Sequence, residues 1–295
     1  MGRKGLYILA AVLMAGVLLL SLDVYADRKA KETVNTLVER FGIEDRVSYG
    51  KVDHSVLKGE TRIENLSFQV KDGVVSVDEV IVSELSDERT RVRFVGISST
   101  DEDFGEFRRN MKDLGYEDVK VNLFLDVRTD REKGDLQVRS LEVEVPGAFS
   151  LSMSLDLGNL SYSFLEKIDE EDLPEITEKV GRIRIRSLEV SLTDLGLRER
   201  AIKREAIKTG KTPERVKEEI LRDLEMSVSE SDPEIKKDLV KNLKTFIDEG
   251  GTIRITARPE TPVSLSDLIL VLLVSAQTRD LSQVVDMLNL RIEHR

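Results

Sequence analysis

The sequence predicts an α+β fold: an N-terminal transmembrane helix, then a curved, mostly antiparallel β-sheet with a helical C-terminal cover. Three observations predict it. An uncharged apolar run opens the chain, apolar residues then recur with a period of two, and the last third changes to helical spacing. These changes predict a membrane anchor or signal peptide at 1–26, a juxtamembrane helix at 27–46, a curved sheet region at 47–193 and a helix-rich segment with closing strands at 194–295.

The N-terminal run predicts where the protein works. Arg3 and Lys4 precede the apolar stretch Leu6–Leu22, and Asp23 ends it. A run of about 17 residues would extend about 26 Å as a helix, against ~30 Å for the hydrocarbon core of a bilayer. We therefore expect a single-pass anchor in the cytoplasmic (inner) membrane, with the body on the periplasmic side. The alternative is a secreted or periplasmic protein produced by cleavage after Ala26.

Composition excludes several classes of function. The net charge is −11, so no excess of basic residues is available to neutralise phosphates, and we expect no nucleic-acid partner. Cysteine is absent, which excludes disulfides and thiolate metal sites. Tryptophan is also absent and aromatic residues make up 5%, so stacking platforms for bases or sugars are scarce.

The segment 47–193 alternates apolar and polar residues, which is typical of half-buried strands separated by turns. The candidate strands are 61–70, 74–82, 90–97, 119–127, 136–145, 149–157 and 182–193. One helix interrupts them, because Thr100-Asp101-Glu102-Asp103 offers an N-cap and Gly115 a stop. A shorter helical piece is expected at 161–180.

One face of this sheet is predicted to be apolar. It is either ordinary core or an open groove that holds an acyl chain, for which each buried methylene contributes ~0.8 kcal/mol. The residues expected to line it are Val121, Leu123, Leu125, Leu151, Met153 and Leu155.

A short pattern recurs three times, at Arg62–Phe68, Gln137–Val143 and Arg184–Val190. In each copy an aliphatic residue and a leucine stand three positions apart, which in a regular strand places them on opposite faces. A β-bulge between them would return both to one face and bend the strand. Chance similarity of Val/Leu/Ser-rich strands is the alternative.

The C-terminal segment is charged and helical. Gly210, Thr212-Pro213 and Asp232-Pro233 mark helix ends and starts, and Gly250-Gly251 precedes a strand at 253–257. The uninterrupted apolar run Leu268–Val274 is too short to span a bilayer and predicts a buried helix. A last helix near 281–288 leads to a closing strand at 290–292.

No motif indicates catalysis. His54 and His294 are the two histidines, too few for a typical zinc site, and Gly210-Lys211-Thr212 lacks the rest of a phosphate-binding loop. We therefore expect no catalytic residues, no metal ligands and no cofactor, and a protein that is not an enzyme.

The region after the anchor resembles a known family. Val47-Ser48-Tyr49-Gly50-Lys51-Val52 and Gly59-Glu60-Thr61-Arg62-Ile63-Glu64-Asn65-Leu66-Ser67-Phe68, followed by Asp72-Gly73 through Val80, are similar to the opening of AsmA-like membrane-anchored bacterial envelope proteins. The likeness covers about residues 5–85, and the helical segment 194–250 departs from it. The resemblance implies a periplasm-facing, groove-forming β protein associated with moving phospholipid or with outer-membrane assembly.

The expected function is therefore a non-enzymatic, membrane-anchored envelope protein that handles lipid or supports envelope assembly, with membrane lipid and envelope proteins as partners. Two alternatives are open. The first is a structural or adaptor protein with a sealed core and no ligand, and the second is a carboxylate-dependent hydrolase.

Overall fold

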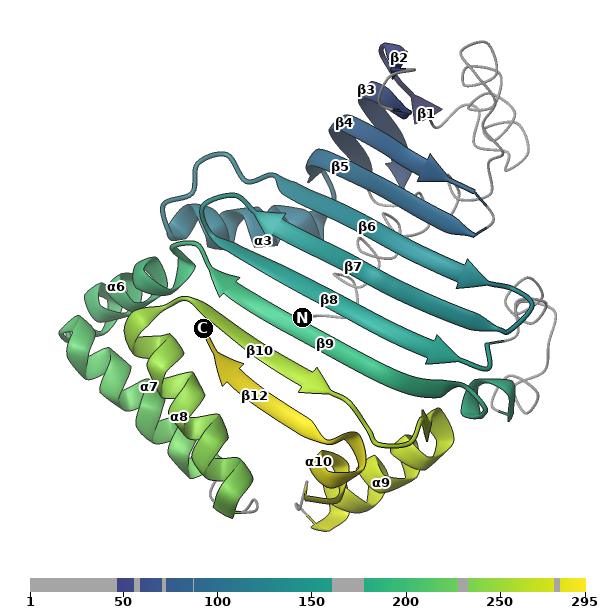
Figure 1. Ribbon diagram of the computed structural model, residues 1–295. Coiled ribbons are helices and arrows are strands. Elements are labelled where there is room, and N and C mark those ends of the chain that lie inside the picture. Colours follow the sequence, from purple (N-terminus) through teal and green to yellow (C-terminus); the bar gives the residue numbers. More distant parts are fainter. Residues whose placement is uncertain are drawn as a thin grey trace. The chain divides into compact units, whose positions relative to one another are not determined.

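The computed structural model describes residues 47–55, 59–70, 73–86, 88–160, 178–227, 233–278 and 282–295. The chain divides into two compact units, drawn together in Figure 1. Of the described residues, the first unit holds those up to Arg128 together with Leu141–Pro146, and the second holds Thr129–Ser140 and those from Gly147 onward.

The first unit is an antiparallel sheet in which strands that follow one another in sequence are mostly neighbours. β3 lies between β1 and β4, β2 also pairs with β3, and β5 lies between β4 and β6. The strands are β1 (Val47–Ser48), β2 (Val52–Ser55), β3 (Glu60–Val70), β4 (Gly73–Leu85), β5 (Arg89–Ser99) and β6 (Val121–Asp130). β7 (Asp135–Val145) is shared between the two units.

The apolar face of this sheet forms the core of the first unit. Its most deeply buried side chains, each under 2% exposed, are Phe94, Val75, Val80 and Val92. A fully buried valine or phenylalanine contributes ~1.5–3 kcal/mol relative to an exposed one, so this cluster is a principal source of the unit's stability.

Ile63 and Leu66, the pair that stands three apart in the first repeat, are both buried in this core. The bulge predicted for this copy is wrong between β3 and β4, because Ile63 pairs with Val80 and Leu66 with Val77 in one unbroken register. Instead Asn65 takes a left-handed conformation with φ of 52°. Ile63 and Leu66 on β3 therefore both point into the core although they stand three apart, and their partners Val80 and Val77 on β4 do the same.

A single helix, α3 (Glu102–Asp113), follows β5 as predicted. Asp101 caps it, since Asp101 Oδ1 accepts a hydrogen bond of 2.9 Å from the Phe104 N–H. Gly115, with φ of 84°, follows its C-terminal end.

The second unit is built on β8 (Phe149–Gly158), β9 (Arg184–Asp194), β10 (Thr252–Ala257) and β12 (Leu290–His294). Each is antiparallel to the next, and β11 (Val263–Ser264) pairs with the start of β9. In the third repeat the register of β8 and β9 shifts between the pairs Asp156–Ser187 and Leu157–Ile185, so the bulge predicted for this copy is confirmed.

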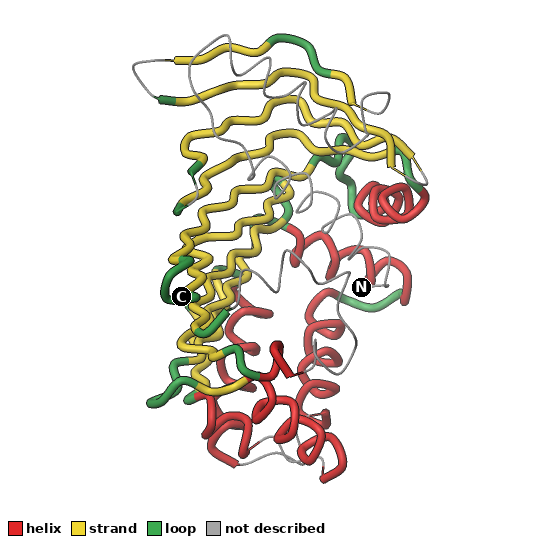
Figure 2. Tube along the Cα trace, turned by 90° about the vertical axis from the view of Figure 1, so that its right-hand side faces the viewer, coloured by secondary structure: helices red, strands yellow, loops and turns green. Residues whose placement is uncertain are grey.

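The helices of the second unit begin and end near the residues that the sequence marks. They are α6 (Leu197–Thr209), α7 (Pro213–Ser227), α8 (Pro233–Glu249), α9 (Leu265–Thr278) and α10 (Ser282–Leu288). In the lower part of Figure 2 they lie on one side of the strands. The Asn242 amide of α8 donates to Ile292 O at 2.9 Å and accepts from His294 N–H at 3.2 Å, so α8 satisfies backbone groups of β12.

The predicted fold class is wrong. The structure is a large antiparallel sheet with helices, and the strands predicted at 253–257 and 290–292 are β10 and β12 of that same sheet, so the C-terminal segment extends the sheet as well as supplying helices. The predicted helices at 1–26 and 27–46, and most of the helical piece at 161–180, lie outside the described residues.

The predicted localisation also needs correction. Within the described ranges, no helix combines the length and the apolar character required to cross a membrane. This finding contradicts the predicted single-pass inner-membrane localisation and the interpretation as a membrane lipid-transport protein. The secreted or periplasmic alternative stays a prediction.

Candidate functional site

The sheet of the second unit has one apolar and one polar face, because apolar and polar residues alternate along its strands, apart from the bulge in β9. Cross-strand pairing aligns Met153, Val190, Ile255 and Ile292 in one apolar row. Ile255 is 41% exposed, so part of this face stays open to solvent.

The six predicted groove residues divide between the two units. Leu123 and Leu125 are buried, and Val121 packs against the core of the first unit. Leu151, Met153 and Leu155 lie on β8 in the second unit, where Leu151 is 38% exposed and the other two are half-buried. The first three are therefore core residues, and only the β8 residues belong to a partly open face.

Helix α9 presents the largest group of exposed apolar side chains. Its inner side is packed, since Leu268 and Val271 contact the buried cluster of Ala257, Val263, Val284 and Leu288. Its outer side is not covered. Five large side chains there are 43–62% exposed, namely Ile269, Leu270, Leu272, Leu273 and Val274. The prediction that Leu268–Val274 forms a buried helix is wrong for this outer side.

The start of α9 is fixed firmly to the sheet. β11 leads directly into the helix, and the Ser264 hydroxyl, which also hydrogen-bonds the Asp267 carboxylate, accepts a hydrogen bond of 3.1 Å from the Asp267 N–H. Leu265 N–H donates to Ile183 O at 2.9 Å. Asp267 is the one charged residue of the helix, and it lies in the first turn. The exposed apolar residues of α9 therefore follow a first turn that carries the helix's one charge and that is hydrogen-bonded to the sheet.

The titratable side chains of the described part of the chain do not gather into a metal-binding cluster. No three His, Cys, Asp or Glu side chains among the described residues come close enough together to hold a metal ion. His294 Nε2 lies 2.6 Å from Gly250 O, a contact in which the ring nitrogen donates. The His54 side chain lies outside the described residues.

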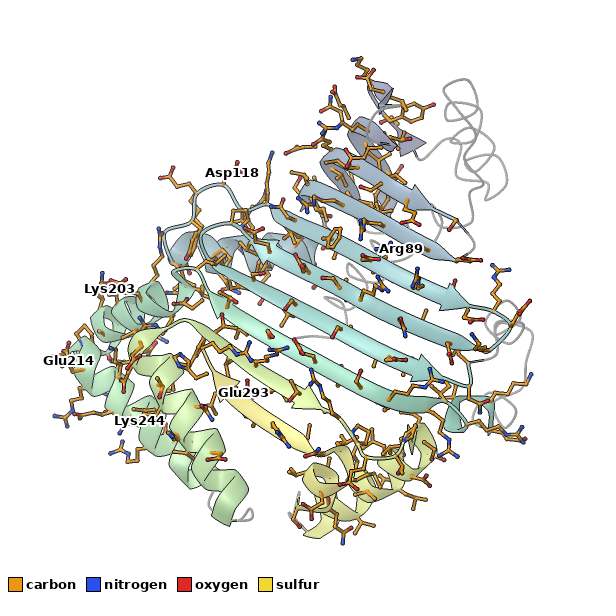
Figure 3. All side chains as sticks on the ribbon, in the orientation of Figure 1. Arg89, Asp118, Lys203, Glu214, Lys244 and Glu293 are labelled. Atoms are coloured by element: carbon orange, nitrogen blue, oxygen red, sulfur yellow. The ribbon has the colours of Figure 1, made fainter. Side chains whose placement is uncertain are left out.

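The carboxylate of Asp126 on β6 is buried in the first unit and binds two arginines, and no motif in the sequence marks it. Arg89, labelled in Figure 3, binds it in a bidentate manner at 3.0 and 2.9 Å, and Arg91 adds contacts of 3.1 and 2.9 Å. The hydrogen bonds from Arg89 hold the pKa of Asp126 below its ordinary value. A carboxylate kept ionised by two arginines is a structural anchor and a poor proton donor.

Comparison with known proteins gives a family without an assigned activity. A family model described as "Uncharacterized protein" matches residues 142–295, more than half of the chain. A protein of Aquifex aeolicus (strain VF5), also described as "Uncharacterized protein", is 29% identical over 292 residues, which cover 96% of this chain and 98% of the relative.

Proposed function

We propose that this chain, which belongs to the family matched at residues 142–295, is a non-enzymatic adaptor that docks onto a partner protein through the outer side of α9. The observation that carries the proposal is the exposure of five large aliphatic side chains on one short helix whose single charged residue, Asp267, lies in its first turn. Contiguous apolar surface of this kind marks protein interaction sites.

The free energy available at this surface is substantial. A helix that is apolar on all sides is normally buried, because each large aliphatic side chain contributes ~1.5–3 kcal/mol when it is removed from water. On the inner side of α9, Leu268 and Val271 already contribute this free energy of burial. Covering the outer side of α9 would contribute several kcal/mol more to the free energy of binding. This gain supports the binding of another protein at α9.

The distribution of the exposed residues favours an apolar groove on the partner over a second copy of α9. At about 100° per residue, Ile269 to Val274 spread over about 200° of the helix circumference. Two identical helices meet along a narrower seam, whereas a groove encloses a wide apolar face, as in helix-in-groove recognition. The net charge of −11 also opposes self-association at low ionic strength.

Site-specific cross-linking tests this proposal. We would place benzoylphenylalanine at Leu270 or Leu273 in the native host, with Lys244, an exposed residue of α8, as the control position. The adaptor function predicts an adduct with one partner protein from both α9 positions and none from Lys244. The purified partner should then bind this chain, and Leu273→Glu should weaken that binding at least tenfold.

Other adducts would contradict the proposal. Cross-links to another copy of this chain would identify α9 as a self-association surface, and cross-links to residues 6–22 of the same chain would make that segment its cover. Adducts with many proteins in equal amounts, or unchanged binding by Leu273→Glu, would also overturn it.

The resemblance to AsmA-like envelope proteins stays a prediction, as do envelope proteins as partners. The open apolar face of β8 to β12 is compatible with either interpretation. The adaptor proposal is favoured because α9 offers more exposed apolar surface than the sheet does.

A further inference from the structure

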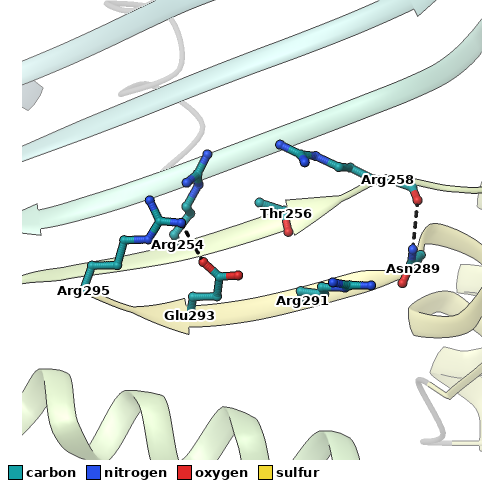
Figure 4. A pocket seen from close by; sticks show the side chains of 7 residues that line it. All are labelled: Arg254, Thr256, Arg258, Asn289, Arg291, Glu293 and Arg295. Carbon is teal, nitrogen blue, oxygen red and sulfur yellow. Dashed lines mark hydrogen bonds and ion pairs between the residues drawn. The ribbon is translucent and has the colours of Figure 1, made fainter.

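The polar face of the second unit carries a pocket lined mainly by arginines. It lies on β10 and β12, has a volume of about 390 Å³, and is shown in Figure 4. Its lining residues are Arg254, Thr256, Arg258, Asn289, Arg291, Glu293 and Arg295. They alternate along each strand with the apolar residues of the opposite face, and Arg254 stands beside Glu293 and Thr256 beside Arg291 across the strand pair.

The positive charges of this pocket exceed the negative ones. Glu189 of β9 pairs with Arg254 and lies 3.7 Å from Arg258, while Glu293 lies 3.0 Å from Arg295. Within the described part of the chain, no side-chain hydrogen bond or ion pair involves Arg291. The four arginines and two glutamates therefore leave a net side-chain charge of +2.

A hydrogen-bond donor in the pocket also lacks a partner. The Arg254 Nε atom is buried and has no hydrogen-bond partner among the described residues, although the Nη2 atom of the same guanidinium binds Glu189. A buried donor without an acceptor costs ~1–3 kcal/mol. The Asn289 side chain is fixed by donation to Arg258 O at 3.2 Å. The pocket thus contains a guanidinium that no described residue binds, Arg291, next to the fixed side chain of Asn289 and to Arg254, whose guanidinium is only partly satisfied.

We propose that this pocket binds a phosphate group, carried by a small molecule or present as the free ion. Guanidinium groups present planar pairs of N–H donors that match phosphate oxygens, and arginine is the preferred residue for such recognition. A phosphate monoester carries close to two negative charges at neutral pH, which corresponds to the excess of +2. Arg291 would supply the principal contact, with Arg254 and Arg258 beside it.

Isothermal titration calorimetry of the full-length chain with inorganic phosphate, in a buffer without other oxyanions, tests the proposal. We expect saturable binding of one phosphate per chain. Arg291→Gln should raise the dissociation constant at least tenfold without unfolding the protein, because no described residue pairs with the Arg291 side chain. Arg139→Gln, at an exposed arginine of β7 outside the pocket, is the matched control and should leave binding unchanged.

Several outcomes would overturn the assignment. These are absence of saturable binding, equal weakening by Arg291→Gln and Arg139→Gln, and tighter binding of malonate than of phosphate, which would assign the pocket to carboxylates. If circular dichroism shows that Arg291→Gln does not fold, Arg258→Gln takes its place, because the Arg258 side chain is 69% exposed. Glycerol phosphate binding more tightly than inorganic phosphate would indicate a small phosphorylated molecule, and equal binding the free ion.

Discussion

The carboxylate of Asp78 on β4 occupies the space in which Gly96 on β5 would carry a side chain. A Cβ atom added to Gly96 would lie 2.0 Å from Asp78 Oδ2. The Gly96 N–H donates to Asn122 Oδ1 at 3.0 Å, and Lys120 Nζ lies 2.7 Å from Asp78 Oδ2. Asp78 can therefore hold this position only because residue 96 has no side chain.

Replacing Gly96 by alanine is expected to destabilise the first unit by about 2 kcal/mol, because the half-exposed Asp78 side chain has to move. Gly96 has φ of 71°, a conformation that costs a residue with a Cβ atom ~1–2 kcal/mol, and the collision with Asp78 adds to this. Urea denaturation measures the change. Gly59→Ala is the control, because Gly59 has φ of 63° and no atom within 4 Å of its added Cβ. Equal losses for the two variants would show that the Asp78 contact contributes nothing.

Substitutions at Asn65 test the backbone conformation that turns both Ile63 and Leu66 of β3 into the core. Its φ of 52° lies in the left-handed region, which asparagine and glycine tolerate and β-branched residues do not. Asn65→Gly should change the free energy of unfolding by less than about 0.5 kcal/mol, whereas Asn65→Val should lower it by about 2 kcal/mol. Thermal denaturation compares the two, and a valine variant as stable as wild type would contradict the backbone conformation.

The local features of the fold could be predicted from the sequence because they depend on neighbouring residues. The cap at Asp101, the left-handed Gly210 and the helix start at Pro213 follow from residue types at fixed offsets. The three-apart spacing of apolar residues also occurs in the neighbouring strands, where it could have predicted further core residues. Val77 and Val80 on β4, and Phe94 and Ile97 on β5, repeat it beside the first copy, and all four are buried.

The candidate surfaces could not be predicted, because they depend on partners distant in sequence. The apolar run of α9 predicts burial, and only the packing of α10 and β10 shows which side is left uncovered. The arginine pocket combines Arg254 and Arg291, whose strands are brought together by the pairing of β10 with β12. A polar residue on an alternating strand is by itself typical of a solvated face.

The Asp126 ion pair is expected to make the first unit sensitive to acid. Its pKa is lowered in the folded state, so its contribution is fully present above the unfolded pKa of ~3.9 and is lost as the pH falls through the folded value. Asp126→Asn should therefore lower stability by about 2 kcal/mol at pH 7, because it removes the charged acceptor that Arg89 and Arg91 share and leaves Glu84 as the remaining ion-pair partner of Arg89. This difference from wild type should shrink below about pH 4.

Urea denaturation of both proteins between pH 3 and pH 7 measures this dependence. Glu117→Gln, at an exposed position, is the control and should follow wild type throughout. A difference that stays constant down to pH 3 would show that Asp126 contributes through packing and not through its charge.

Truncating a buried leucine of α10 and an exposed leucine of α9 should change the free energy of unfolding by very different amounts. Leu288 is buried in the cluster that holds the inner side of α9, so Leu288→Ala should lower the free energy of unfolding by about 2–4 kcal/mol. Leu270 is 62% exposed, so Leu270→Ala should change it by less than about 0.5 kcal/mol. Denaturation of the purified chain without its partner makes the comparison, and both variants remove the same side chain. A large loss for Leu270→Ala would mean that the outer side of α9 is already covered within the free protein, and that it is not available for docking.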